Sequence, residues 1–153
     1  MGTRSTIALE FADGTVEQIY CHWDGYLDHN GAILAEHYSD PFKLRDLIDL
    51  GDLSSLRPNI GEKHAFSQFE LRAEEVAGYK LLTENMCTFY GRDRGETGIT
   101  AKKFKDFEDY KTNFQHEEYA YILRTDGNWY VKQYSNEFEL LKNALETEKE
   151  CAE

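Results

Sequence analysis

The sequence predicts a single α+β domain in which an antiparallel sheet of about five strands is covered by helices on one face. Three observations predict it: two Asp-Gly turns flanked by β-rich runs, one lone apolar run between them, and apolar residues at helical spacing elsewhere. The length of 153 residues and the 41% hydrophobic content suit one core, so residues 1–153 are predicted to form one domain.

Two hairpins and a lone strand make up the predicted sheet. Asp13-Gly14 separates the strands of the first hairpin, and Asp126-Gly127-Asn128 separates those of the second. The predicted strands are residues 4–11, 15–23, 86–90, 118–124 and 129–133.

The first half of the chain contains two predicted helices. Asp28 or Asn30 is expected to cap a short helix with Ile33, Leu34 and His37 on one face. The next helix has clearer boundaries: Asp40 at the N-cap, Pro41 at the first helical position, and Gly51 after the end. Residues 52–56 are expected to add one further helical turn.

The second half is predicted less completely. Residues 59–85 show no clean period, so strand, helix and loop all stay open, and residues 91–95 are expected to be a turn. Residues 102–113 suit an amphipathic helix. A terminal helix is expected to begin at Ser135 and to align Phe138, Leu141 and Leu145, with residues 146–153 as a frayed acidic tail.

Charge and cysteine content exclude several classes of protein. Seventeen Lys and Arg against 29 Asp and Glu give a net charge of −12, which opposes binding of nucleic acid through its phosphates. It leaves open a basic protein partner, a cation, an imitation of nucleic-acid charge, or plain solubility. No run is long and apolar enough to span a membrane, and the N-terminus lacks the apolar core of a signal peptide. Three cysteines without CxxC spacing favour a reducing cytoplasm.

The segment around His22 is the candidate for catalysis or metal binding. His22 and Asp24 would share one face of a strand, where they could bind a metal or act as a base and its orienting group. His29 would extend the catalytic set, and His37 the metal shell. The alternative is a buried, hydrogen-bonded cluster without chemistry, and no cofactor is predicted.

A glycine-flanked turn with two arginines is the candidate for recognition. Arg92 and Arg94 could present guanidinium groups to a carboxylate or phosphate, or could pair with the protein's own carboxylates. The predicted binding residues are Arg92, Asp93, Arg94, Glu96, Tyr26 and Tyr90.

Several blocks of the sequence carry a resemblance to a known family. They are TRSTIALEFADGTVEQIYCHWDGYLDHNG, LGDLSSL, FYGRDRGE and DGNWYV, in that order, with CHWDGY and YGRDRGE the most distinctive. The chain resembles a family of small, uncharacterised proteins of bacteriophages and prophages. The resemblance implies a phage accessory protein that acts in the host cytoplasm, and it supplies no catalytic residues.

The predicted function is therefore binding. By analogy with other small acidic phage proteins, we expect an anti-CRISPR-like protein that modulates or inhibits a host nuclease or defence complex through protein–protein contact. A small metal-dependent or acid–base hydrolase that uses His22, Asp24 and His29 is the first alternative. A structural or regulatory phage component is the second.

Overall fold

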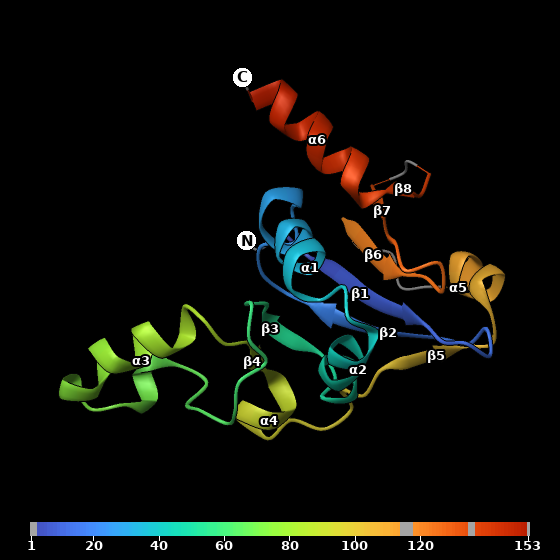
Figure 1. The fold of residues 1–153 in the computed structure, drawn as a ribbon. Helices are drawn as coiled ribbons and strands as arrows, with labels where there is room; N and C mark the ends of the chain where they lie inside the picture. Colours follow the sequence, from blue (N-terminus) through green and yellow to red (C-terminus); the bar gives the residue numbers. More distant parts are fainter. Residues whose placement is uncertain (1–2, 114–117, 135–136, 153) are drawn as a thin grey trace.

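The computed structural model describes residues 3–113, 118–134 and 137–152, whose strands form one mixed sheet (Figure 1). The strands are β1 (Ser5–Glu10), β2 (Val16–Cys21), β3 (Leu53–Ser55), β4 (Thr88–Phe89), β5 (Lys102–Phe104), β6 (Tyr119–Leu123), β7 (Trp129–Gln133) and β8 (Glu139–Leu140). Their spatial order is β4-β3-β2-β1-β6-β7-β8, and β5 pairs with the part of β2 that β3 leaves open.

Both predicted hairpins are confirmed, because each turn has the local chemistry it needs. Gly14 adopts φ +92°, and Asp13 accepts a hydrogen bond from the Thr15 backbone at 3.0 Å between β1 and β2. Gly127 adopts φ +83°, and Asp126 accepts one from the Asn128 backbone at 2.9 Å between β6 and β7.

The prediction of an antiparallel sheet of about five strands is wrong. The sheet has eight strands in the described residues, and β1 runs parallel to β6 with Ser5 opposite Tyr119. The pair β2–β3 is also parallel. Local turn chemistry fixes the direction within each hairpin, but the long crossover between the hairpins allows either direction.

Two short strands replace predicted helical segments. Within residues 52–56, Leu53–Ser55 forms β3 instead of a helical turn, since the backbone N–H groups of His22 and Trp23 donate to the carbonyl oxygens of Leu53 and Ser54. Residues 102–104 form β5 beside β2, so the helix predicted over residues 102–113 is reduced to its second half. The lone strand predicted at residues 86–90 shortens to β4.

One face of the sheet is covered by helical segments from both halves of the chain. They are a π-turn at Leu27–Gly31, α1 (Ala32–His37), α2 (Pro41–Asp49) and α6 (Leu141–Ala152). Asp40 caps α2 by accepting from the Phe42 backbone at 2.9 Å, and Gly51 follows the helix at φ +84°, so both boundary predictions are confirmed. The prediction that Asp28 or Asn30 caps the preceding helix is wrong. The N-cap residue of α1 is Gly31, and the buried Asn30 side chain donates to the hydroxyl of Ser5.

A second, smaller core lies on the opposite face of the sheet. The prediction that helices cover only one face is therefore wrong. In this smaller core α5 (Phe107–Asn113) packs Tyr110 with Phe104, Ala8 and Ile122. All six residues of β1 are buried, because both faces of this central strand are covered. Ile7 and Leu9 contribute to the larger core and Ala8 to the smaller one.

The C-terminal helix is confirmed with different boundaries. It begins at Leu141, and Phe138 precedes it and packs against the smaller core on the α5 face. The predicted cap Ser135 lies outside the described residues, as does the last residue of the chain. Residues 146–152, predicted as a frayed tail, continue α6.

The segment that showed no period projects from the sheet. It contains two 3-10 turns, Gln68–Glu70 and Ala73–Glu75, followed by α3 (Val76–Thr83). Figure 1 shows these elements standing away from the body, on the far side from α5. After β4 the predicted turn is a short helix, α4 (Tyr90–Arg94), which ends at Gly95 with φ +73°.

Candidate protein-interaction surface

Residues 60–85, called the arm below, contribute no residue to the two cores. The arm carries several large apolar side chains that are exposed, although the side chain of His64 at its base is only 4% exposed. Phe69 is 90% exposed, Leu81 67% and Leu82 40%. Large exposed apolar side chains are candidates for contact with another molecule, and three of them lie on this one projecting element.

Local hydrogen bonds give the arm its shape. The Ser67 hydroxyl accepts from the Phe69 backbone at 3.1 Å, and the Glu70 carboxylate accepts from the backbone of Phe66 at 2.7 Å, which together begin the first turn. The Tyr79 hydroxyl on α3 donates to the carbonyl oxygen of Phe66 at 2.8 Å. The two sides of the arm are therefore tied together by polar contacts.

A buried carboxylate fixes the arm to the sheet. Asp93 accepts hydrogen bonds from the backbone of His64 at 3.0 Å and of Phe89 at 2.8 Å, and from Arg92 Nε at 3.1 Å. His64 is itself enclosed, with Nε2 at 2.9 Å from the carbonyl oxygen of Cys87. Since Asp93 lies in α4 and His64 in the arm, this side chain is one of the contacts that join the arm to the body.

Arg92 and Asp93, predicted as recognition residues, both serve this internal network. The guanidinium group of Arg92 donates to the carbonyl oxygens of Ile60 and Cys87 at 2.9 Å each, and it lies 4.6 Å from the centroid of the Phe89 ring. Its side chain is 12% exposed and that of Asp93 is fully buried. Their prediction as surface recognition groups is wrong, because the helical turn of α4 directs both side chains inward.

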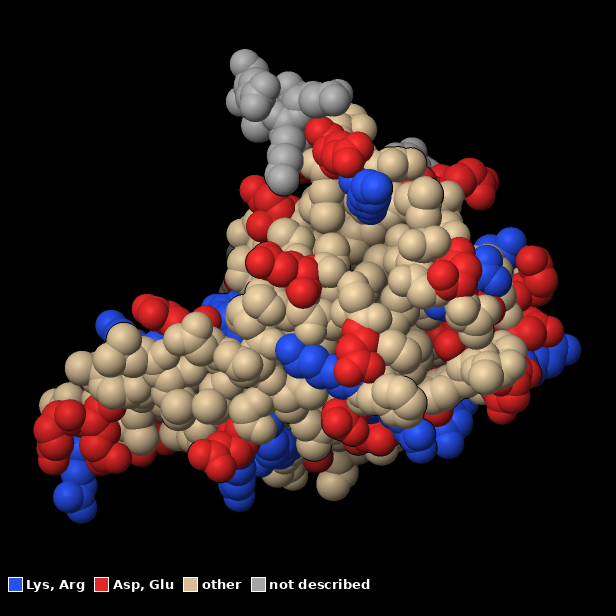
Figure 2. All heavy atoms as spheres, viewed as in Figure 1, with Lys and Arg blue, Asp and Glu red and all other residues tan. Residues whose placement is uncertain are grey.

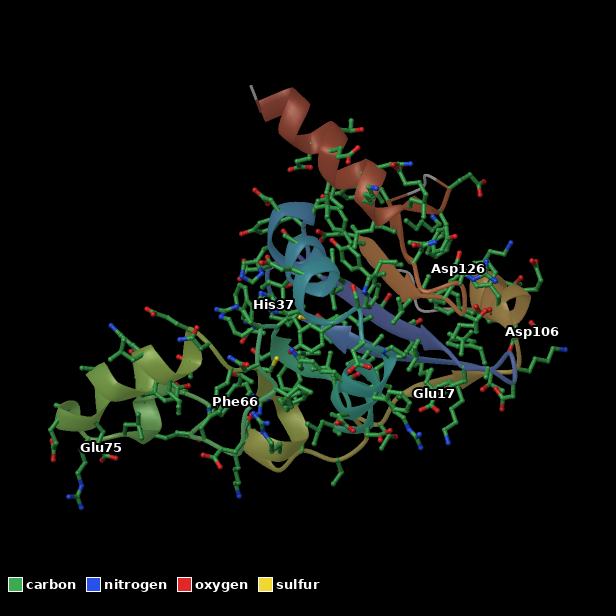
Figure 3. All side chains as sticks on the ribbon, in the orientation of Figure 1. Glu17, His37, Phe66, Glu75, Asp106 and Asp126 are labelled. Carbon is green, nitrogen blue, oxygen red and sulfur yellow. The ribbon has the colours of Figure 1, made fainter. Side chains whose placement is uncertain are left out.

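Arg94 and Glu96 stay at the surface beside the base of the arm. Two guanidinium nitrogens of Arg94 donate to one Glu96 oxygen at 3.1 and 2.8 Å, with both side chains at least 40% exposed. The guanidinium group also lies 4.5 Å from the ring centroid of Phe66 and 5.1 Å from that of Tyr90. Figure 3 shows Phe66 at the body end of the arm and Glu75 at its far end. The predicted residues Arg94, Glu96 and Tyr90 therefore border the arm.

Tyr26 is connected to the arm through two intermediate side chains. It is 38% exposed, and its ring centroid lies 6.0 Å from that of His29. Arg57 donates to His29 Nε2 at 3.3 Å and, through its own Nε, to the carbonyl oxygen of Thr83 at 3.2 Å. This contact sequence places Tyr26 on the side of the body that meets the end of α3.

The residues predicted for metal binding or acid–base catalysis do not converge. His22 Nδ1 shares a hydrogen bond of 2.8 Å with the Tyr20 hydroxyl, and His37 lies 3.9 Å from a Glu36 oxygen. His29 comes no closer than 4.0 Å to the Asp24 carboxylate. Among the described residues, no three His, Cys, Asp or Glu side chains are arranged to hold a metal ion.

The cysteine in the same segment is a core residue. Cys21 is buried, and burial raises the pKa of its thiol to about 12. Asn30 donates to its sulfur at 3.4 Å and also contacts Ser5 and the carbonyl oxygen of Trp23. A thiol in this state is not an activated nucleophile. The structural alternative, a buried cluster with Trp23 in the core, is wrong for Trp23, which is 43% exposed, while Cys21 and Asn30 are buried and hydrogen-bonded.

Comparison with family models, curated proteins and solved structures finds no match to this chain. In the described part of the chain, no helix combines the length and the apolar character needed to cross a bilayer. The resemblance to the phage family stays a prediction.

The sequence did not point to the residues that define the arm. The sequence gives no sign of the contacts of His64 and Arg57, because nothing in their neighbours shows that each will reach a distant backbone carbonyl. The apolar residues of the arm did carry a signal: residues 59–85 contain aromatic and aliphatic side chains that follow neither the helical nor the strand period. A segment without either period has no single apolar face to pack against a core. Several of its apolar side chains accordingly remain exposed in the arm.

Proposed function

We propose that this chain is an acidic, phage-encoded binding protein that modulates or inhibits a host nuclease or defence complex through direct protein–protein contact. The observation that carries the proposal is the arm, whose turns are held by local hydrogen bonds and which exposes Phe69 and Leu81. Apolar groups held in place before binding lose little conformational entropy on association.

The charge distribution indicates the chemistry of the partner. The arm holds five acidic and three basic residues, a net charge of −2, so the other residues carry −10 of the total −12. Figure 2 shows acidic groups at the end of the arm and around the body, with an extended surface of neither sign between them. A partner that fits has an apolar centre with a basic rim.

Nucleases match this description because their substrate channels hold phosphates with Lys and Arg. Opposite charge on the two proteins would accelerate their encounter and make it sensitive to salt. The proposal thus assigns affinity to the apolar side chains of the arm and steering to the acidic body.

Photo-crosslinking in bacterial cells tests the proposal. A benzophenone amino acid is placed at Leu81 in the arm or, as a control, at exposed Lys103 in β5. We expect the arm position to crosslink a subunit of a nuclease or defence complex that the control position does not capture. The proposal fails if both positions capture the same proteins, or if the captured partner belongs to neither class.

The purified partner then allows a matched comparison. Phe69→Ser and Leu81→Ser should each weaken binding by about tenfold or more, because central apolar contacts dominate interfaces. Phe42→Ser removes a phenylalanine of similar exposure, 74%, from α2 on the body and should leave the affinity unchanged. Equal effects of all three substitutions would exclude the arm as the contact surface.

A further inference from the structure

A pocket of about 500 Å³ lies where the parallel strands β1 and β6 end together. Its apolar wall is formed by Leu9, Phe11, Phe42 and Leu123. Volumes of this order suit small organic ligands, which bind mostly to apolar surface with a few polar groups that fix their orientation. In Figure 1, β1 points away from the arm toward α5, so this strand-end pocket is remote from the proposed interaction surface.

The single carboxylate that lines the pocket is already neutralised. Glu10 has only 8% of its side chain exposed, and Arg124 donates to its two oxygens at 3.2 and 3.1 Å. The backbone and hydroxyl of Thr125 add hydrogen bonds at 3.0 and 3.3 Å. Glu10 therefore presents neither a free charge nor a free acceptor to a ligand.

The second arginine of the pocket has no such partner. Arg45 is exposed on α2, three residues after Phe42, so both side chains extend along the same side of that helix. Within the part of the chain that the structure describes, its guanidinium group makes no ion pair or hydrogen bond. With two arginines and one glutamate, the lining carries a charge of +1 in a protein of −12.

We propose that the strand-end pocket binds a small amphipathic carboxylate, such as a medium-chain fatty acid. The hydrocarbon part would lie against the apolar wall, and the carboxylate would pair with the guanidinium fork of Arg45. The anion is specified because the pocket lining carries a net charge of +1 beside its apolar wall. This site does not depend on the proposed interaction with a host protein.

Titration with octanoate, followed by amide NMR spectra, tests the inference. We expect saturable shifts at Leu9 and Leu123, and binding about tenfold weaker in Arg45→Gln, which loses one charged contact on an exposed helix face. Octanol, which lacks the carboxylate, should bind wild type and Arg45→Gln alike. Arg72→Gln, an exposed arginine of the arm, is the matched control and should bind octanoate like wild type.

The Ala12→Trp variant and a peptide ending in leucine provide two further tests. Ala12→Trp places a large ring at the exposed edge of the pocket and should abolish octanoate binding while the spectrum stays that of the folded protein. The inference is overturned if octanoate produces no saturable shifts, or if Arg45→Gln and Arg72→Gln bind it equally. A peptide ending in leucine that binds more tightly than octanoate would also overturn it, in favour of a chain terminus as the ligand.

Discussion

The carboxylate of Asp93 accepts a hydrogen bond from the backbone N–H of His64 at 3.0 Å, and this contact joins α4 to the beginning of the arm. The same carboxylate receives the backbone N–H of Phe89 and Nε of Arg92. The attachment of the arm therefore includes a buried charge that accepts three hydrogen bonds.

Replacement of this charge should loosen the arm. Asp93→Asn removes the negative partner of Arg92 and one of the acceptor oxygens, so we expect the free energy of unfolding to fall by about 3 kcal/mol. Amide hydrogen exchange in residues 60–85 should accelerate more than in β1 or β6. Asp46→Asn, on the exposed side of α2, should change stability by less than about 0.5 kcal/mol. Unchanged exchange in the arm of Asp93→Asn would contradict this account.

The Glu10–Arg124 pair should make the free energy of unfolding decrease at acidic pH. Partial burial of Glu10 opposes ionisation, but the hydrogen bonds from Arg124 and Thr125 outweigh it and hold the pKa of Glu10 below its ordinary value of 4.5. Because the pKa is lower in the folded chain than in the unfolded one, the stabilisation is present near neutral pH and is lost as the pH falls through the folded pKa.

Glu10→Gln should therefore be less stable than wild type by about 1–2 kcal/mol at pH 7, with the difference shrinking below about pH 4. Urea denaturation across this range measures it. Glu74→Gln, an exposed change in the arm, should show no such pH dependence. A constant difference between Glu10→Gln and wild type from pH 7 to pH 3 would show that the charge is not responsible.

The buried thiols should be inert in the native protein. Burial raises the pKa of Cys21 to about 12, and it raises that of Cys87 as well. In a Cys151→Ser background, we expect no rapid reaction with a disulfide reagent at pH 8, and reaction of two thiols after denaturation. Rapid labelling of the folded variant would mean that one of these thiols is accessible.

Two glycines with similar backbone angles should respond differently to alanine. Gly51 has φ +84°, and a Cβ atom there would lie 2.3 Å from the carbonyl oxygen of Ile99. Gly98 has φ +75° with open space around it. We expect Gly98→Ala to destabilise by about 1 kcal/mol through backbone strain and Gly51→Ala by about 3 kcal/mol because a clash is added. Thermal or urea denaturation that gives equal effects would exclude the clash.

Elements determined by adjacent residues were predictable from the sequence. Asp40 and Pro41 define the beginning of α2, and Gly14 and Gly127 permit the hairpin turns, because each acts on its own backbone or that of near neighbours. The strands of both hairpins follow from these turns. The same reasoning did not place Trp23, which was expected in the core and is 43% exposed.

Features that depend on distant partners were not predictable in the same way. β3 and β5 are short, and each becomes a strand through pairing with residues distant in the sequence, β3 with β2 and β4, and β5 with β2. Arg92 and Arg94 are close in sequence, yet one is enclosed by the carbonyl groups of Ile60 and Cys87 while the other reaches solvent. A one-dimensional pattern shows that charges are close together and leaves open which of them point inward.

The parallel pairing of β1 with β6 cannot form during synthesis until both strands have been made. Ser5 is synthesised 114 residues before its partner Tyr119. Until then the central strand has one open edge, and such edges invite pairing with other chains. Translation speed and chaperone occupancy during this interval should thus decide how much nascent product reaches its final form.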